Sequence, residues 1–598
     1  MTASSLSLPK DERSPYRSYR VVAISMVIQS PFPAVPVTDV LLHEKVLSAL
    51  QRHAEKHPTK AALVNAENPS EKVTYGQLRA QVFAVSSFLH KHGFGYRDVV
   101  CQVLPNSIEY AVGYLAALNC GGAMSGASAM FTDYELERQF QDSKSKAVIT
   151  DGPHLDKVMK AVANCPTVKV VLCVKPPPGP LPAKAFDWKD AIGCHMKALP
   201  HFPRKLDDLA LLPYSSGTTG SPKGVMLTHK NFGTMIDVVN DHYRTVCVPK
   251  LKGGDKWDWY KQNVLLVLPF YHIYGFGVLN MCLLEGTTGV IMSKFDPIVF
   301  LSSIEKYKIE ILMIVPPIVL LMVRHPAVPK FDLSSVQLVL TGAAPLGKEL
   351  CDEFFAKFKN IRFLAQAYGM TECGMASHLP AYDRKDNYNT VGHIAATFEQ
   401  KIIDPVTGKE VGIGERGEIC VRGPTIMKGY LGRPKATAET IDKEGWLHTG
   451  KRSEMLLAVV SIHIRKFYSE NSPLPGDVGY LNKSGETFIV DRIKELIKVK
   501  GLQVPPAELE DLLHGHPDVA DVAVIGIPDE KVGERPKAFV VKANSTLTAE
   551  QVAKFVESKV SPYKWLTGGV EFIDEIPKSP SGKILRRMLR DRVPLAKL

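Results

Sequence analysis

The chain has 598 residues, with 73 Lys or Arg, 62 Asp or Glu and a formal net charge of +11. This length exceeds one ordinary hydrophobic core, so we expect at least two domains. Hydrophobic residues make up 45% and charged residues 23% of the chain, which excludes a disordered, collagen-like or coiled-coil protein. The basic surplus is thinly spread, without a dense Lys/Arg run or a nucleic-acid-binding motif. It favours an anionic small ligand over nucleic acid.

The ten cysteines form no CxxC pair, and none follows Cys420. This spacing argues against a disulfide framework and against a zinc site, and it indicates a reducing compartment. No apolar run reaches the roughly 18 residues of a membrane-spanning helix. The nearest run, Ile311 to Val323, is interrupted by Pro316-Pro317. We therefore expect no membrane span.

The regular pattern begins only at about residue 42. Residues 1–33 are predicted to be a disordered leader, and Met26 is an alternative start. Apolar residues at helical spacing predict a helix over 42–57, a strand follows at 60–64, and a Thr cap opens a helix over 74–93.

The strand–helix alternation continues to about residue 345. It predicts an α/β fold whose large N-terminal body has two α/β layered subdomains with largely parallel sheets. Between about 390 and 490 the segments shorten and turn residues multiply, which predicts a small β-rich subdomain. A compact α+β cap follows. We therefore expect domains at 34–493 and 494–598.

The most informative segment is Tyr214 to Gly224 (YSSGTTGSPKG), which follows an apolar strand at Leu209 to Leu212. Its glycines allow the backbone to approach an anion closely, and its hydroxyl groups and Lys223 supply donors and charge. It is not the GxxxxGK[ST] loop, because Gly224 follows Lys223. The segment predicts a phosphate-binding loop rather than a bland surface turn.

This loop resembles the phosphate loop of adenylate-forming (AMP-binding) enzymes, which include acyl-CoA synthetases, 4-coumarate–CoA ligases and beetle luciferases. The resemblance extends from about residue 34 onward, with the other motifs in the family's order. It implies ATP and AMP binding by Ser215, Ser216, Gly217, Thr218, Thr219, Gly220 and Lys223.

Two further segments resemble the family's nucleotide motifs. In Tyr368 to Glu372 (YGMTE), the resemblance implies that Tyr368 stacks on adenine beside Gly369, that Thr371 donates to the α-phosphate and that Glu372 binds Mg²⁺. One carboxylate is chemically sufficient for a hard cation that bridges ATP phosphates. The segment Thr341 to Leu346 resembles the adenine-side loop, although a simple strand-to-helix turn is an alternative. Its small residues are Gly342, Ala343 and Ala344.

The segment Pro269 to Gly275 places His272 where the family has its acid-pocket histidine. A histidine there can contact carboxylate or phosphate oxygens and orient the attack. The alternative is a hydrogen-bonded core histidine. The resemblance also places four neighbours near the acid: Ile273, Tyr274, Gly277 and Val278.

Charged residues gather at the domain junction between Asp491 and Gln503. The alternation over residues 496–501 predicts a strand and turn rather than a solvated helix face. By resemblance, Asp477 and Arg492 bind the ribose, and Lys494 is the hinge. Lys498 acts in thioester formation, and Gly501 and Gln503 lie near the acid or CoA.

Near the end of the chain, Lys583 follows a Ser-Gly turn. Read alone this is an unremarkable basic loop, but the family uses this lysine in adenylation, where a cation offsets repulsion between carboxylate and phosphate. The resemblance thus implies catalytic roles for His272, Thr371, Lys498 and Lys583. It implies a two-step reaction with ATP, Mg²⁺ and CoA, in which the cap rotates about Lys494 between adenylation and thioester formation.

One segment departs from the family pattern. Gly450 and Asp477 are normally adjacent, whereas residues 451–476 separate them here. An inserted surface loop would expose about ten apolar residues beside a nucleotide site. We hypothesise a translated, unspliced intron, since Gly-Lys can encode a GTAAG donor and Ser-Pro-Leu-Pro-Gly can encode a pyrimidine-rich acceptor. We expect this form to have reduced activity.

The chain ends in Ala596-Lys597-Leu598, which resembles a peroxisomal address. It predicts recognition by the peroxisomal import receptor, and otherwise a cytoplasmic location. The leading function is an ATP-dependent carboxylic acid–CoA ligase, similar to 4-coumarate–CoA ligases. The alternatives are a medium- or long-chain fatty acyl-CoA synthetase, a luciferase-type monooxygenase and an inactive nucleotide-binding protein. The acid itself is not evident from the residues.

Overall fold

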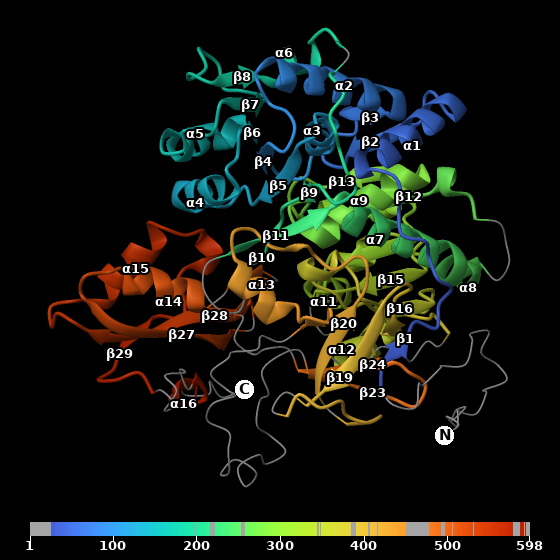
Figure 1. Ribbon diagram of the computed structural model, residues 1–598. Helices are drawn as coiled ribbons and strands as arrows, with labels where there is room; N and C mark the ends of the chain where they lie inside the picture. The colour runs from blue at the N-terminus through green and yellow to red at the C-terminus, as the bar shows by residue number, and fades with distance from the viewer. Residues whose placement is uncertain are drawn as a thin grey trace.

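A computed structural model gives the fold of most of the chain (Figure 1). It describes every residue outside the following positions: 1–25, 198, 216–221, 253–256, 344–345, 347, 384–389, 405–406, 416, 450–477, 492–496, 501, 505, 530, 578–585, 591 and 594–598. Among the described residues, no helix is both long enough and apolar enough to cross a membrane.

The largest sheet of the body has nine strands, ordered β10-β11-β9-β5-β4-β6-β7-β8, with β21 paired to β11. Strands β4 to β8 are parallel, as the alternation predicts. Its strands are β4 (Val99–Val103), β5 (Ala123–Ala127), β6 (Ala147–Asp151), β7 (Val170–Val174), β8 (Ala185–Asp187), β9 (Leu209–Leu211), β10 (Tyr214–Ser215), β11 (Lys223–Thr228) and β21 (Gly429–Tyr430). The helices between them are α3 (Ile108–Asn119), α4 (Asp133–Ser143), α5 (Leu155–Ala163) and α6 (Trp188–Ile192).

A second layered unit contains a four-stranded sheet, β12-β13-β2-β3, and a three-stranded parallel sheet, β14-β15-β16. The strands are β2 (Ala61–Asn65), β3 (Lys72–Thr74), β12 (Asn263–Leu266), β13 (Thr288–Ile291), β14 (Ile311–Ile314), β15 (Leu338–Thr341) and β16 (Phe363–Gln366). The helices that flank these strands along the chain are α1 (Leu42–Lys56), α2 (Tyr75–Lys91), α7 (His229–His242), α8 (Val248–Lys252), α9 (Ile273–Glu285), α10 (Pro297–Tyr307), α11 (Pro316–Arg324) and α12 (Lys348–Lys357). Of these, α7 also packs on β9 and β11 of the large sheet.

Local sequence explains where several of these helices begin. At the start of α2, the Thr74 hydroxyl accepts from the Gln77 backbone N–H while the Gln77 side chain accepts from the Thr74 N–H. Helix α4 begins with the same reciprocal arrangement between Thr132 and Glu135. These bonds satisfy backbone donors that the first helical turn leaves without partners. The predicted helices over 42–57 and 74–93 are confirmed as α1 and α2.

The β-rich subdomain is a six-stranded sheet, β1-β19-β20-β23-β24, with β22 paired to β20. Its strands are β1 (Ile28–Gln29), β19 (Glu399–Ile403), β20 (Gly417–Arg422), β22 (Leu447–His448), β23 (Val478–Leu481) and β24 (Thr487–Asp491). A short ladder, β17 (His378–Leu379) with β18 (His393–Ile394), and helix α13 (Pro434–Thr440) complete the subdomain.

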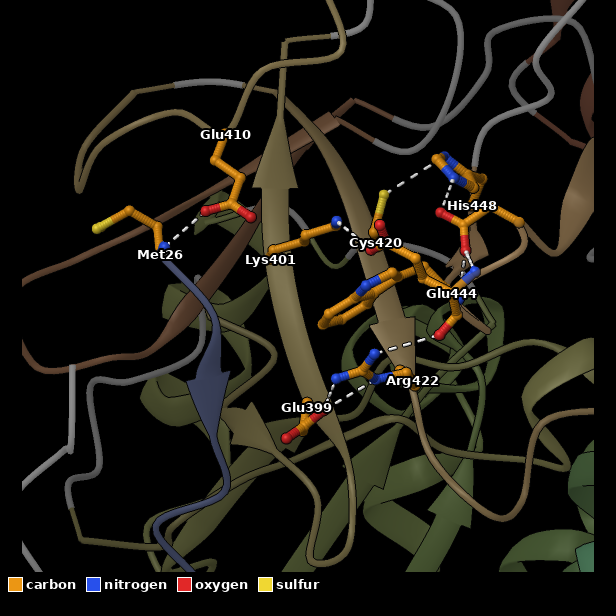
Figure 2. Close-up of polar contacts among 10 residues, drawn as sticks. Met26, Glu399, Lys401, Glu410, Cys420, Arg422, Glu444 and His448 are labelled. Atoms are coloured by element: carbon orange, nitrogen blue, oxygen red, sulfur yellow. Dashed lines mark hydrogen bonds and ion pairs between the residues drawn. The ribbon is translucent and has the colours of Figure 1, made fainter. Parts of the chain in front are cut away.

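The prediction of a disordered leader over residues 1–33 is wrong for residues 26–33. Ile28 pairs with Gln400 across β1 and β19, and its side chain packs with Ile402 and Leu481. The Met26 backbone N–H also donates to Glu410 at 2.6 Å (Figure 2). Burying apolar side chains at a sheet edge stabilises this segment in a way that its own composition does not reveal.

The cap has a separate five-stranded sheet, β26-β25-β28-β27, with β29 paired to β28. It packs around its own hydrophobic core and lies beside α4 of the body (Figure 1), where the Thr132 hydroxyl donates to Lys559 of the cap. The predicted α/β body with an α+β cap is confirmed, and the boundary predicted at 494 lies outside the described residues. The cap elements are β25 (Ile497–Val499), β26 (Leu502–Val504), α14 (Pro506–His514), β27 (Val519–Asp529), β28 (Gly533–Lys542), α15 (Ala549–Glu557), β29 (Val570–Phe572) and α16 (Arg586–Arg590).

Candidate active site

Glu372 lies at the centre of the candidate site, in a short turn of 3-10 helix (Thr371–Cys373) that follows β16. It is buried, with 6% of its surface exposed. Its Oε1 atom accepts hydrogen bonds from the Ser215 hydroxyl at 3.0 Å and the Tyr430 hydroxyl at 2.8 Å. Because both donors are neutral, they orient the carboxylate without cancelling its charge. A fixed, charged carboxylate of this kind suits a hard cation.

The large sheet brings the two hydroxyl donors together with Lys223. Ser215 on β10 pairs with Lys223 on β11. Strand β21, which contains Tyr430, also pairs with β11. The Lys223 ammonium is 5.1 Å from the centroid of the Tyr430 ring. Burial and the neighbouring Glu372 raise the pKa of Tyr430, so it remains a protonated donor. The predicted phosphate-loop lysine, Lys223, and the predicted metal ligand, Glu372, therefore both contact the Tyr430 side chain.

A second hydrogen-bonded chain holds β10 in position. The Tyr214 hydroxyl donates to Asp142 at 2.8 Å, and Arg433 donates to the other oxygen of Asp142 at 3.0 Å. Burial, reinforced by Asp142, raises the pKa of Tyr214. Sequence reasoning missed Asp142, Tyr430 and Arg433. They lie on separate elements with no common spacing, so no local signal marks them as partners of the phosphate loop.

The Tyr368 to Glu372 segment is tightly packed. A Cβ atom at Gly369 would lie 1.9 Å from the backbone oxygen of Met375, so only glycine fits there. Tyr368 is 3% exposed, and its ring lies 5.5 Å from the His378 ring. Protein atoms cover the Tyr368 ring in this structure. The predicted stacking on adenine therefore requires that one face of the ring become exposed. Thr371 is half-buried at the start of the 3-10 turn.

The predicted adenine-side loop and the acid-side helix are in contact. A Cβ atom at Gly342 would lie 3.5 Å from the Tyr274 ring, and the Tyr274 hydroxyl donates to Leu340 at 3.4 Å. Ala343 is exposed and has a φ of +68°, a left-handed conformation that a non-glycine residue adopts only under strain. Strained backbone of this kind clusters at ligand sites.

His272 immediately precedes α9, and its residue surface is exposed to solvent. This excludes the alternative of a hydrogen-bonded core histidine. Desolvation by the surrounding protein lowers the pKa of the His272 imidazole. The imidazole is therefore neutral at neutral pH and able to accept or donate one hydrogen bond at each nitrogen.

The first turns of α9 supply the other predicted acid-side residues. Ile273 and Val278 are buried, and Val278 lines an apolar cavity together with Tyr243 and Trp257. A Cβ atom at Gly277 would lie 2.0 Å from the sulfur of Met375, which follows the YGMTE segment. The acid-side helix is thus packed directly against the nucleotide motif.

Part of the predicted set lies in the cap or outside the described residues. Lys498 and Gln503 pair across the hairpin of β25 and β26, which confirms the strand and turn predicted there. The roles of the residues outside the described part of the chain stay predictions. These residues are Ser216, Gly217, Thr218, Thr219, Gly220, Ala344, Asp477, Arg492, Lys494, Gly501 and Lys583.

A buried ion pair network joins the cap to the body near this site. The Lys564 ammonium of the cap donates to Glu135 on α4 at 2.6 Å and to Glu508 on α14 at 3.0 Å. The Ser561 hydroxyl also donates to Glu135, at 2.7 Å. Burial alone would lower the pKa of Lys564, but the two carboxylates raise it above its usual value. Lys564 therefore stays charged although it is only 3% exposed.

Comparison with known proteins identifies the family. The sequence profile described as AMP-binding enzyme matches residues 50–431, and the profile described as AMP-binding enzyme C-terminal domain matches residues 508–583. The chain belongs to the AMP-binding enzyme family. The two matches agree with the division of this structure into a large body and a small cap.

Characterised relatives narrow the class. A 4-coumarate–CoA ligase of Petroselinum crispum is 40% identical over 89% of this chain and 91% of its own length. A 4-coumarate–CoA ligase of Nicotiana tabacum is 38% identical over 95% of this chain and 98% of its own length. The amide bond synthetase McbA from Marinactinospora thermotolerans shares the fold, with a TM-score of 0.74, 24% identity and coverage of 92% and 99%. The predicted class, an AMP-forming acid–thiol ligase that uses ATP, Mg²⁺ and CoA, is confirmed for this AMP-binding enzyme.

Proposed function

We propose that this AMP-binding enzyme joins CoA to an aromatic propenoic acid of the 4-coumarate type. In the first step the acid carboxylate attacks the α-phosphorus of ATP, which forms an acyl-adenylate and releases pyrophosphate. In the second step the CoA thiol attacks the acyl carbonyl, which forms the thioester and releases AMP. The observation that carries the proposal is the Glu372 carboxylate, held by Ser215 and Tyr430 beside Lys223.

The chemistry assigns a separate task to each group in the body. Both hydroxyl groups bind Oε1 of Glu372, so among the described residues Oε2 is the oxygen oriented for Mg²⁺. Mg²⁺ bound there would neutralise charge on the ATP phosphates. Lys223 would balance further phosphate charge, and His272 would orient the acid carboxylate for attack. In the cap, we assign Lys583 to adenylation and Lys498 to thioester formation.

The acid side of the site supports an apolar substrate. Tyr274 lies against the adenine-side loop, and Val278 lines an apolar cavity that also contains Met281 and Met313. Apolar walls with a single orienting histidine suit an acid whose carboxylate is its main polar group. An aromatic propenoate and a fatty acid share that property, and identity to two 4-coumarate–CoA ligases favours the aromatic acid.

ATP–pyrophosphate exchange with a panel of acids tests the proposal. The panel contains 4-coumarate, cinnamate, benzoate, octanoate and palmitate, with an acid-free control. We expect the highest exchange rate with 4-coumarate or cinnamate, followed by thioester formation when CoA is added. A higher rate with octanoate or palmitate would overturn the substrate class. The absence of exchange with every acid, together with retained ATP binding, would favour the inactive nucleotide-binding form.

Residues 451–476 lie outside the described residues. We propose that they are a retained intron and that they lower the rate of acyl-adenylate formation. Thr449 lies just before the insert, and its hydroxyl donates to the Ile419 carbonyl oxygen on β20 at 2.8 Å. The predicted ribose ligand Asp477 follows the insert, so a displacement of about 1 Å there would cost about 10²-fold in rate. Comparing exchange rates of the full chain and a 451–476 deletion tests the effect on activity, and equal rates would overturn it.

Sequencing transcripts across residues 450–477 tests the intron hypothesis, and a continuous exon in all messages would exclude it.

We also propose that Ala596-Lys597-Leu598 directs the protein to peroxisomes through the peroxisomal import receptor. These residues lie outside the described part of the chain. The support is the resemblance of a small residue, a base and a terminal leucine to the SKL-type address. Adding one residue after Leu598 to a fluorescent fusion should abolish peroxisomal location. An unchanged distribution would contradict the proposal.

A further inference from the structure

A second group of chemically active side chains lies in the β-rich subdomain, away from Glu372. Glu418 and Cys420 are two residues apart on β20, so both side chains lie on one face of the strand. His448 on β22 is the direct cross-strand partner of Cys420. One ligand atom from each of these residues lies within 4.8 Å of the other two. Figure 2 shows Cys420 and His448 facing each other across the strands.

Two distances within this cluster, both from His448 Nδ1, match those of a tetrahedral metal site. His448 Nδ1 is 3.3 Å from Glu418 Oε2 and 3.5 Å from Cys420 Sγ. With Zn–N and Zn–O bonds of about 2.0–2.1 Å and a Zn–S bond of about 2.3 Å, tetrahedral geometry places N and O about 3.3 Å apart and N and S about 3.5 Å apart. The N···O distance is also longer than the usual hydrogen bond of about 2.7–3.2 Å.

A further carboxylate orients the histidine. Asp442 Oδ2 lies 3.3 Å from His448 Nε2, on the side of the ring opposite the cluster. The other oxygen, Oδ1, accepts from the backbone N–H groups of Glu444 and Trp446, both at 2.9 Å. Metal-binding histidines almost always donate their second ring N–H to a carboxylate or carbonyl in this way. Asp442 therefore fixes the tautomer in which Nδ1 is the ligand atom.

Burial and charge favour a zinc ion over magnesium. Glu418, Cys420 and His448 are all buried. Zn²⁺ bound by one thiolate, one carboxylate and a neutral imidazole has no net charge, which limits the cost of burying the ion. Thiolate and imidazole ligands suit Zn²⁺, whereas Mg²⁺ prefers oxygen ligands alone. The Glu372 carboxylate and this mixed cluster therefore suit different ions.

We propose that Glu418, Cys420 and His448 bind one Zn²⁺ ion, which ties β22 to β20, with Asp442 orienting His448. Binding forms Zn–O, Zn–S and Zn–N bonds and releases the Cys420 thiol proton to solvent. Three protein ligands leave a fourth position for water. The cysteine spacing predicts no zinc site, because that test looks for paired cysteines. This ligand set escapes that test because its residues are separated by the chain between Cys420 and His448.

Metal binding by the full-length protein tests the proposal directly. Chelator-stripped protein is titrated with Zn²⁺ by calorimetry, and Co²⁺ serves as a spectroscopic probe of the ligands. We expect about one Zn²⁺ per chain and a rise in the midpoint of thermal unfolding. Bound Co²⁺ should give intense visible bands of a tetrahedral site and a near-ultraviolet thiolate-to-cobalt band. Absence of stoichiometric Zn²⁺ binding by the wild-type chain would overturn the proposal without any variant.

Two variants locate the site. Cys420→Ser should abolish the thiolate-to-cobalt band and greatly weaken Zn²⁺ binding. Cys351→Ser, which changes a buried cysteine on α12 in another part of the body, should leave both unchanged. His448→Gln provides a second removal if Cys420→Ser folds poorly. Equal Zn²⁺ uptake by the wild type and the Cys420→Ser or His448→Gln variant, or loss of the band in Cys351→Ser, would overturn the assignment.

Discussion

Two buried carboxylate clusters in this protein differ in the charge of their hydrogen-bond donors. At the junction of cap and body, Glu135 and Glu508 share the Lys564 ammonium. In the candidate active site, the described side chains that donate to the Glu372 carboxylate are the hydroxyl groups of Ser215 and Tyr430. A buried ammonium compensates carboxylate charge inside the protein, whereas neutral hydroxyls hold a carboxylate in place and leave its charge available. The first arrangement is suited to fixing structure and the second to binding a cation.

The largest effect should come from removing the cation at the junction. Lys564→Met leaves two buried carboxylates close together, so we expect a loss of about 3–5 kcal/mol in the free energy of unfolding. Urea denaturation of the wild type and the variant measures it. The matched control is Lys554→Met, because Lys554 and Glu550 form an exposed i,i+4 pair. That control should leave the free energy of unfolding nearly unchanged, because solvent screens an exposed pair.

A double variant identifies the cause of that loss. Glu135→Gln combined with Lys564→Met removes one of the uncompensated carboxylates, so it should recover part of the stability. If the double variant is as unstable as the sum of the single variants, the charges are independent. The comparison between the two clusters would then fail at the junction.

The second effect concerns rate rather than stability. Glu372→Gln keeps an oxygen that can accept from Ser215 and Tyr430 but removes the charge, so we expect ATP–pyrophosphate exchange to fall by about 10²–10³-fold. The urea midpoint should change little. Glu399→Gln, in a partly exposed ion pair with Arg422, is the control and should leave exchange unchanged. A stability loss like that of Lys564→Met would make Glu372 a structural residue.

A buried histidine supplies a third case, with a neutral partner and no charge. His378 is buried and hydrogen-bonded to Gln400 at 2.7 Å, and burial lowers its pKa to about 4. The unfolded chain binds a proton near pH 6.5, whereas the folded protein does not, so stability falls as the pH drops from about 6.5 towards 4. At pH 5 this residue should cost about 2 kcal/mol. Urea denaturation at pH 7.5 and pH 5 should show a smaller difference in His378→Gln, and an equal difference would contradict the assignment.

The smallest effect should come from one hydroxyl group. Tyr430→Phe removes one of the two bonds to Glu372 and leaves the Ser215 bond, at a cost of about 1.5 kcal/mol. We expect exchange to fall by about tenfold, well short of the Glu372→Gln loss. Titrating Mg²⁺ during the exchange assay should show a raised requirement for the ion. A loss equal to that of Glu372→Gln would mean that Tyr430 acts on the substrate directly.

The sequence by itself determined what depends on neighbouring residues. The strand before Tyr214, the capping residues of α2 and the hairpin of Lys498 and Gln503 were predictable, because helices, strands and turns follow from local spacing and backbone preferences. The family and the reaction class were predictable for a related reason. Their motifs are short and continuous, and they occur in a fixed order.

Only the tertiary structure decided which distant residues meet. Ser215 and Glu372 are 157 positions apart, and Glu135 and Lys564 are 429 apart. Residues 26–33 joined the body because a sheet edge buries Ile28, and Cys420 met His448 because β20 and β22 pair. No local pattern encodes such contacts. They form when the packing of separate elements buries apolar surface and brings their polar groups within hydrogen-bond distance.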